Sequence, residues 1–169
     1  MPNSVSRLNA ESAAHATPAE STLSCSRVVG APPDKVWQEL AALDQIDRWA
    51  KGVDHAAFTT TITQGPGAVR RVTMGLITVI ETVTAWGPPR HLAYTIEGLP
   101  TFLVRRVTNS WQLEPAGEGT RVTLTTLIVA RPHRVGRLAA AVLRRVMAGV
   151  SDKLLGGLAD YFAAPASSS

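Results

Sequence analysis

The sequence predicts an α+β domain in which an antiparallel sheet of six to seven strands is covered by one long C-terminal helix. Three observations carry this prediction. Between Val53 and Val129, β-branched residues dominate and glycine and proline turns recur. The connections between the resulting strands are short, as in an antiparallel meander. From His133 to Phe162, apolar residues recur at the three- and four-residue spacing of a helix face.

The residues before the sheet predict one strand and two short helices. The first strand is expected at Thr22–Val29. Ala31–Asp34 opens a helix, because proline is tolerated in a first helical turn and an aspartate suits the positive helix end. The apolar residues that follow share one helix face: Val36, Trp37, Leu40 and Leu43. A second short helix or turn runs from Asp44 to Trp49, and Gly52 ends it.

Turn residues divide the sheet region into successive strands, with breaks at Gln64–Gly67, Gly75, Gly87–Pro89 and Gly117–Gly119. The main predicted strands are Val69–Met74, Ile77–Trp86, His91–Glu97, Phe102–Glu114 and Thr120–Val129. In the last strand, apolar residues alternate with polar ones, so one face of the sheet is buried. A second layer must cover that face.

The C-terminal helix supplies the second layer. Its apolar stripe comprises Val135, Leu138, Val142, Val146, Val150, Leu154, Leu158 and Tyr161. We expect this stripe to pack on the sheet. Gly149, Gly156 and Gly157 are poor helix formers, and they indicate either close packing on the sheet or a bend that accommodates something.

The chain is expected to form one domain over residues 21–162, with disordered tails at 1–20 and 163–169. A length of 169 residues suits a single domain. The first tail is rich in Ser, Ala, Asn and Pro and has no period. Cys25 is the lone cysteine and excludes an internal disulfide. No secretory signal or membrane-spanning stretch is recognisable, so we expect a soluble, cytoplasmic protein.

The formal net charge of +4 comes largely from three arginine-containing segments, Arg70–Arg71, Arg105–Arg106 and Arg131–Arg145. Solvated faces that favour solubility are the preferred interpretation. The alternative is an anionic partner such as a membrane surface, with Arg131–Arg145 as a basic amphipathic docking segment. No run reaches the roughly five or six like charges of a binding tail, and no nucleic-acid partner is expected.

Four segments, in this order, resemble the START-like superfamily, in particular its polyketide cyclase/dehydrase and lipid-transport branch. They are the helix entry Ala31–Trp37, the second helix Leu43–Trp49, the strand pair Glu81–Val83 with Pro88–Tyr94, and the last strand Gly119–Leu124. The resemblance covers about residues 21–162. It implies the helix-grip fold, in which a curved sheet wraps around the long helix and leaves a cavity open at one end. The superfamily includes carriers, ligand-binding proteins and aromatic-polyketide cyclases, so the resemblance does not decide between binding and catalysis.

Polar residues in phase with apolar neighbours on the predicted strands are candidates for ligand contact: Glu81, Tyr94, Arg105 and Asn109. They face the concave side of the sheet if no bulge intervenes. A buried carboxylate needs a partner, so Glu81 either pairs with Arg71 or Arg105, which is the favoured interpretation, or contacts ligand. The flanking valines leave the strand parity of Arg70 and Arg71 ambiguous.

Aromatic residues are the candidate walls of the cavity: Trp49, Phe58 and Trp111. Trp49 is the better candidate, because it follows a short helix expected near the opening. Core packing is the favoured interpretation of Trp111. Tyr94 is suited to orienting a ligand hydroxyl, although a buried tyrosine usually has a partner for its own hydroxyl.

The sequence has no nucleophile elbow, phosphate-binding glycine loop or zinc-ligand spacing, and no metal or cofactor is expected. We expect binding or transport of a hydrophobic small molecule, such as a lipid, polyketide, isoprenoid or aromatic metabolite. One alternative is a cyclase or dehydratase acting on a polyketide-like chain, with the four polar residues as the working set. A second is the docking module of the basic helix. Catalytic residues and oligomeric state stay open.

Overall fold

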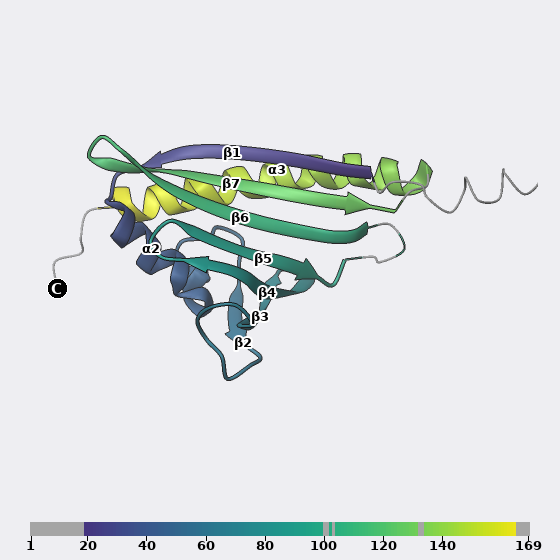
Figure 1. Ribbon diagram of the computed structural model, residues 1–169, viewed down its shortest axis with the longest axis horizontal. Coiled ribbons are helices and arrows are strands. Elements are labelled where there is room, and N and C mark those ends of the chain that lie inside the picture. The colour runs from purple at the N-terminus through teal and green to yellow at the C-terminus, as the bar shows by residue number, and fades with distance from the viewer. Residues whose placement is uncertain (1–18, 100–101, 103, 132–133, 165–169) are drawn as a thin grey trace, which may run out of the picture.

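Seven antiparallel strands form one sheet in the order β1-β7-β6-β5-β4-β3-β2, and a long helix runs beside it (Figure 1). The computed structural model describes residues 19–99, 102, 104–131 and 134–164. The elements are β1 (Ala19–Val29), α2 (Pro33–Ala41), the 3-10 helix η1 (Leu43–Arg48), β2 (His55–Phe58), β3 (Val69–Met74), β4 (Ile77–Gly87), β5 (His91–Glu97), β6 (Val104–Ala116), β7 (Gly119–Ala130) and α3 (Arg134–Ala163). This arrangement confirms the predicted helix-grip fold class.

Strand pairing moves several of the predicted strand boundaries. β1 starts at Ala19 rather than Thr22, because it pairs with β7 along its whole length, from Ala19 opposite Ala130 onward. β6 starts at Val104 rather than Phe102. The predicted tails were too long at their inner ends, because Ala19 and Glu20 belong to β1 and Ala163 belongs to α3. The rest of the predicted N-terminal tail, residues 1–18, and residues 165–169 of the predicted C-terminal tail lie outside the described residues.

The two short helices close one end of the sheet. α2 begins with proline at its first turn and Asp34 beside it, as the sequence predicts, and it buries Val36, Trp37 and Leu40. Trp37 meets Trp86 of β4 edge to face, with 5.1 Å between ring centroids. η1 buries Leu43 and Ile46 and packs beside β2. These contacts bring the backbone of η1 over the inner face of β3.

α3 packs mainly on β1 and β7 (Figure 1), and its two halves differ in burial. In the C-terminal half, Leu154 and Leu158 are buried as predicted. In the N-terminal half, the predicted stripe does not pack on the sheet: its side chains are between 55% and 69% exposed at Val135, Leu138, Val142 and Val146. The prediction was wrong there, because the helix turns Ala140 rather than this stripe toward the sheet.

Gly157 explains how closely the C-terminal half of α3 approaches the rest of the fold. A Cβ at this position would collide with the backbone carbonyl of Trp49. Close packing is therefore the correct interpretation of this glycine, although the neighbour is the segment after η1 rather than the sheet. A Cβ at Gly149 would have no neighbour within 4 Å among the described residues.

The buried side chains of the described residues form two clusters. The larger one joins α2, η1, the sheet and the C-terminal half of α3. The smaller one lies under the N-terminal half of α3 and comprises Val104, Val107, Ile128, Ala130 and Ala140, with Leu99, Leu143 and Met147 packed against it. Ile96 contacts both clusters.

Candidate functional site

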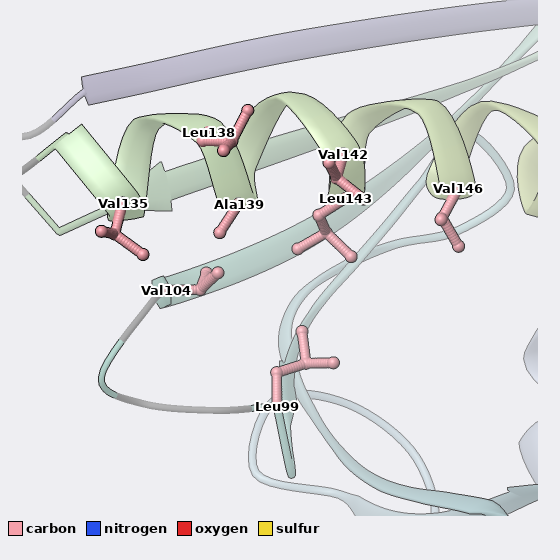
Figure 2. Close-up of a pocket in the computed structure, with 8 residues that line it drawn as sticks. All are labelled: Leu99, Val104, Val135, Leu138, Ala139, Val142, Leu143 and Val146. Carbon is pink, nitrogen blue, oxygen red and sulfur yellow. The ribbon is translucent and has the colours of Figure 1, made fainter.

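An apolar groove of about 430 Å³ lies between the N-terminal half of α3 and the sheet. Among the described residues, those that line it are all apolar: Leu99, Val104, Val135, Leu138, Ala139, Val142, Leu143 and Val146. Figure 2 shows Leu99 and Val104 on the sheet side, opposite the side chains of α3. The groove thus lies between the uncovered helix stripe and Val104 of the smaller buried cluster, with Leu99 and Leu143, which pack against that cluster, also lining it.

Strand register defines the inner face of the sheet beyond the groove. One row of paired residues crosses it from β2 to β7: Phe58, Arg70, Glu81, Ile96, Val107 and Ile128. The neighbouring row contains Tyr94, Asn109 and Thr126. Adjacent rows on one face are separated by two residues, or about 6.6 Å along a strand. Polar side chains therefore occur in the same row as Val107 and Ile128 of the smaller cluster, at Arg70 and Glu81, and in the row next to it.

Arg70 and Glu81 form a buried ion pair on this inner face. The Arg70 Nε and Nη2 atoms lie 2.8 Å and 2.6 Å from Glu81 Oε2. Arg70 Nη1 also donates to the backbone carbonyl of Leu43 in η1. Both side chains are almost fully buried, so these contacts compensate charges that water does not reach.

The expected partners of Glu81 were wrong. Arg71 is exposed, because β3 alternates regularly and turns Arg70 inward together with Val72. Arg105 is exposed at a β-bulge: Val104 lies opposite Ala130 and Arg106 opposite Val129, so Arg105 is the extra residue. The bulge removes Arg105 from the inward parity that an uninterrupted strand would give it.

Tyr94 is the centre of a buried hydrogen-bond cluster. Its hydroxyl oxygen accepts from Trp111 Nε1 at 3.2 Å and from Asn109 Nδ2 at 3.4 Å. The Oδ1 atom of Asn109 accepts from Thr126 Oγ1 at 2.7 Å. Among the described residues, no acceptor receives the hydroxyl proton of Tyr94 itself.

Burial and charge keep that hydroxyl protonated. Desolvation, reinforced by the negative charge of Glu81, raises the pKa of Tyr94 to about 12. The Arg70 guanidinium opposes this shift and lies 5.5 Å from the centroid of the Tyr94 ring. At neutral pH the phenol is therefore a hydrogen-bond donor and not a base.

Trp49 and Phe58 occupy different surroundings. Trp49 is buried and meets Trp111 edge to face, with 6.0 Å between ring centroids. Its Nε1 donor has no hydrogen-bond partner among the described residues. Phe58 is half-buried on the edge strand β2, opposite Arg70. Trp111 is fully buried and belongs to the larger core cluster.

Most of the residues expected at the site lie on one face, although they do not line the groove. Glu81, Tyr94, Asn109, Trp111 and Trp49 all belong to the buried interior. Arg105 does not join them. It borders a neighbouring hollow with Glu97 and Arg106 at the start of β6.

Sequence reasoning did not assign Arg70 to the site. It expected a cavity between the sheet and the long helix only from the family resemblance, and it named other lining residues than those of the groove. The signal for Arg70 was its spacing of two residues from Val72, which puts both side chains on the same face of the strand. Val69, an apolar residue of the opposite parity, obscured this signal. The groove had no signal in periodicity, because an apolar helix stripe looks the same whether protein covers it or not. Among the described residues, no cluster of three or more His, Cys, Asp or Glu side chains is arranged to hold a metal ion. No described helix is long and apolar enough to cross a membrane.

Comparison with solved structures supports the fold assignment. The chain is similar to the di-domain ARO/CYC BexL from the BE-7585A biosynthetic pathway, at 17% identity with a TM-score of 0.71, covering 86% of this chain and 51% of that one. It is similar to TTHA0849 from Thermus thermophilus, at 24% identity with a TM-score of 0.67, covering 88% and 100%. It is also similar to Ara h 8.0201, at 16% identity with a TM-score of 0.63, covering 83% and 98%.

The sequence itself gives the family. No curated protein matches the chain. The family described as polyketide cyclase/dehydrase and lipid transport matches residues 21–163, which include every strand from β2 to β7, all of α3 and nearly all of β1. The chain therefore belongs to the polyketide cyclase/dehydrase and lipid-transport family of the START-like superfamily.

Proposed function

We propose that the chain binds or carries a hydrophobic small molecule, of the lipid, polyketide, isoprenoid or aromatic class, in the groove beside α3. The observation that carries this proposal is the all-apolar lining, four of whose helix side chains remain more than half exposed. Covering such surface is favourable by about 25 cal/mol for each Å² removed from water. An apolar ligand would supply the cover that the sheet does not.

The family supports the same class of ligand. Its description combines polyketide cyclisation with lipid transport, and both involve largely apolar molecules. The similar BexL is a di-domain ARO/CYC protein from the BE-7585A biosynthetic pathway. At 17% identity this likeness supports the fold alone, so the ligand class rests on the family and the groove.

A second candidate function, a cyclase-like enzyme, is favoured by one specific observation. The Tyr94 hydroxyl accepts two hydrogen bonds and has its own proton uncommitted among the described residues. A protonated phenol in a low-dielectric surrounding is suited to polarising a carbonyl oxygen. In this candidate, Tyr94 acts as the donor, and Asn109 and Trp111 orient its oxygen.

Filling the groove tests the primary proposal. Ala139→Trp places a large side chain among the lining residues, whereas Ala141→Trp adds the same side chain outside the groove, where Ala141 is exposed. We expect the first variant to lose at least tenfold in affinity for a fluorescent apolar probe, and the second to bind like the unmodified chain. Equal binding by all three proteins would contradict the proposal.

Identification of the ligand uses the unmodified chain. Native mass spectrometry of freshly purified protein, followed by organic extraction, should release a stoichiometric apolar compound if the chain is a carrier. The same extraction from Ala139→Trp should release much less. Turnover of a polyketide-like substrate that is lost in Tyr94→Phe would favour the second candidate.

A further inference from the structure

The uncovered helix stripe is continuous with a set of exposed arginines. On a helix, residues three, four and seven apart share a side. Arg134 and Arg145 stand four residues before and seven residues after Leu138, so both border the apolar stripe on the side away from the sheet. Both arginines are exposed, and neither has an ion pair among the described residues. We refer to Arg134, Leu138 and Arg145 as the helix lip.

The opposite edge of the groove is also basic. Val104 lines the groove from the sheet side, and Arg105 and Arg106 follow it directly. The bulge at this point leaves both arginines exposed, where regular alternation would have turned one of them inward. Phe102, just before Val104, is 69% exposed. We refer to Phe102, Arg105 and Arg106 as the sheet lip.

Acidic side chains are sparse around both lips. Residues 98–113 and 119–151 contain no Asp or Glu. Glu97 lies beside Arg105 and Arg106, and Glu20 lies beside Arg137 and Arg144 on the β1 side of the helix. Within the described residues, the surface therefore combines exposed apolar side chains with four arginines that form no ion pair.

The combination of apolar and positively charged side chains favours one binding partner of this surface over another. A second copy of the chain, placed symmetrically on the same surface, would bring like charges of both lips together. An anionic lipid surface offers acyl chains to the apolar stripe and phosphate or carboxylate groups to the arginines. We propose that the two lips dock the protein on an anionic bilayer, with the groove opening toward the lipid.

The inference goes beyond ligand binding, because it concerns a surface that binds without any ligand in the groove. Where the chain carries a lipid-soluble molecule, docking places the groove at the source of that molecule. The two proposals can fail separately. Probe binding in solution reports on the groove, and vesicle binding by the empty protein reports on the lips.

Vesicle co-sedimentation of the full chain tests the docking. Vesicles of phosphatidylcholine containing phosphatidylserine should bind the protein, whereas pure phosphatidylcholine vesicles should bind it much less, and added salt should weaken binding. Arg134→Gln with Arg145→Gln should weaken binding more than tenfold, at roughly fivefold per charge near the surface. Leu138→Gln should weaken binding to the same vesicles by removing apolar contact.

Matched control variants separate docking through the two lips from a general electrostatic attraction of the basic protein to anionic vesicles. Arg71→Gln with Arg121→Gln removes the same charge from exposed positions away from both lips, and Leu76→Gln changes a leucine that is fully exposed at the β3–β4 turn. Both controls should bind like the unmodified chain. The proposal is overturned if the arginine control weakens binding as much as the lip variant. Equal binding to neutral vesicles, or a dimer in sedimentation that shields Leu138, would overturn it too.

Discussion

At the scale of single residues, the buried pair of Arg70 and Glu81 organises the polar interior. The carboxylate has two guanidinium contacts, and the guanidinium also reaches the carbonyl of Leu43. A buried charge in a low-dielectric region is strongly destabilising unless its oppositely charged partner is also present. The pair therefore ties β3 and β4 to η1, and removal of one member is more damaging than removal of both.

Glu81→Leu should lower the free energy of unfolding by about 3–5 kcal/mol, because it leaves the Arg70 charge buried without its partner. Urea denaturation at neutral pH measures this loss. The double variant Arg70→Met with Glu81→Leu should lose clearly less, because it removes both charges. An equal loss in the single and double variants would mean that packing, and not the unpaired charge, explains the effect.

Tyr94 makes the stability depend on pH in the alkaline range. Its pKa is about 12 in the folded chain against the ordinary tyrosine value of 10.0, so the folded state retains a proton that the unfolded state releases. The stabilisation is fully present below pH 10 and is lost as the pH rises through 12. Tyr94→Phe should remove this slope from a series of urea unfolding curves. A slope that survives in Tyr94→Phe would have to come from other groups.

At the scale of elements, α3 combines two helix halves with different roles. The C-terminal half is held by close packing, since Gly157 lies against the carbonyl of Trp49. The N-terminal half has an exposed apolar stripe and a groove beneath it. One continuous helix thus anchors the fold at one end and leaves its other end available for binding.

Two alanine substitutions in α3 should have opposite effects. Gly157→Ala should lower the unfolding free energy by about 1–3 kcal/mol, because the new methyl group collides with a backbone carbonyl. Gly149→Ala should raise it by about 1 kcal/mol, because alanine favours helix and the position has open space. Thermal and urea unfolding of both variants measure the difference. Stabilisation by Gly157→Ala would show that this end of the helix is not tightly packed.

At the scale of the whole molecule, the sequence predicted the elements better than their faces. Alternation and turns located His91–Glu97 and Val69–Met74 at their observed bounds. Alternation did not reveal that Arg105 is an extra residue, because a bulge is determined by the partner strand. Helical periodicity identified the apolar stripe of α3. It carries no information on how the helix is rotated over a curved sheet, so the residues that line the groove could not be predicted, although the family resemblance implied a cavity between helix and sheet.

The two buried clusters imply that the molecule opens unevenly. The smaller cluster is covered by a helix half whose stripe is exposed, whereas the larger cluster is enclosed by α2, η1 and the C-terminal half of α3. Segments with few buried apolar contacts open at lower free energy than the core. The stretch of α3 from Leu138 to Val146 should therefore exchange its amide hydrogens faster than the stretch from Ser151 to Leu158.

Hydrogen exchange followed by mass spectrometry measures this gradient and tests it with an added ligand. A bound apolar probe stabilises only the states that bind it, so it should slow exchange from Leu138 to Val146 and change exchange from Ser151 to Leu158 little. In Ala139→Trp the probe should have no such effect, because the groove is filled. Uniform exchange along α3 would mean that the helix opens as one unit with the core, and the groove would then be a rigid feature of the fold.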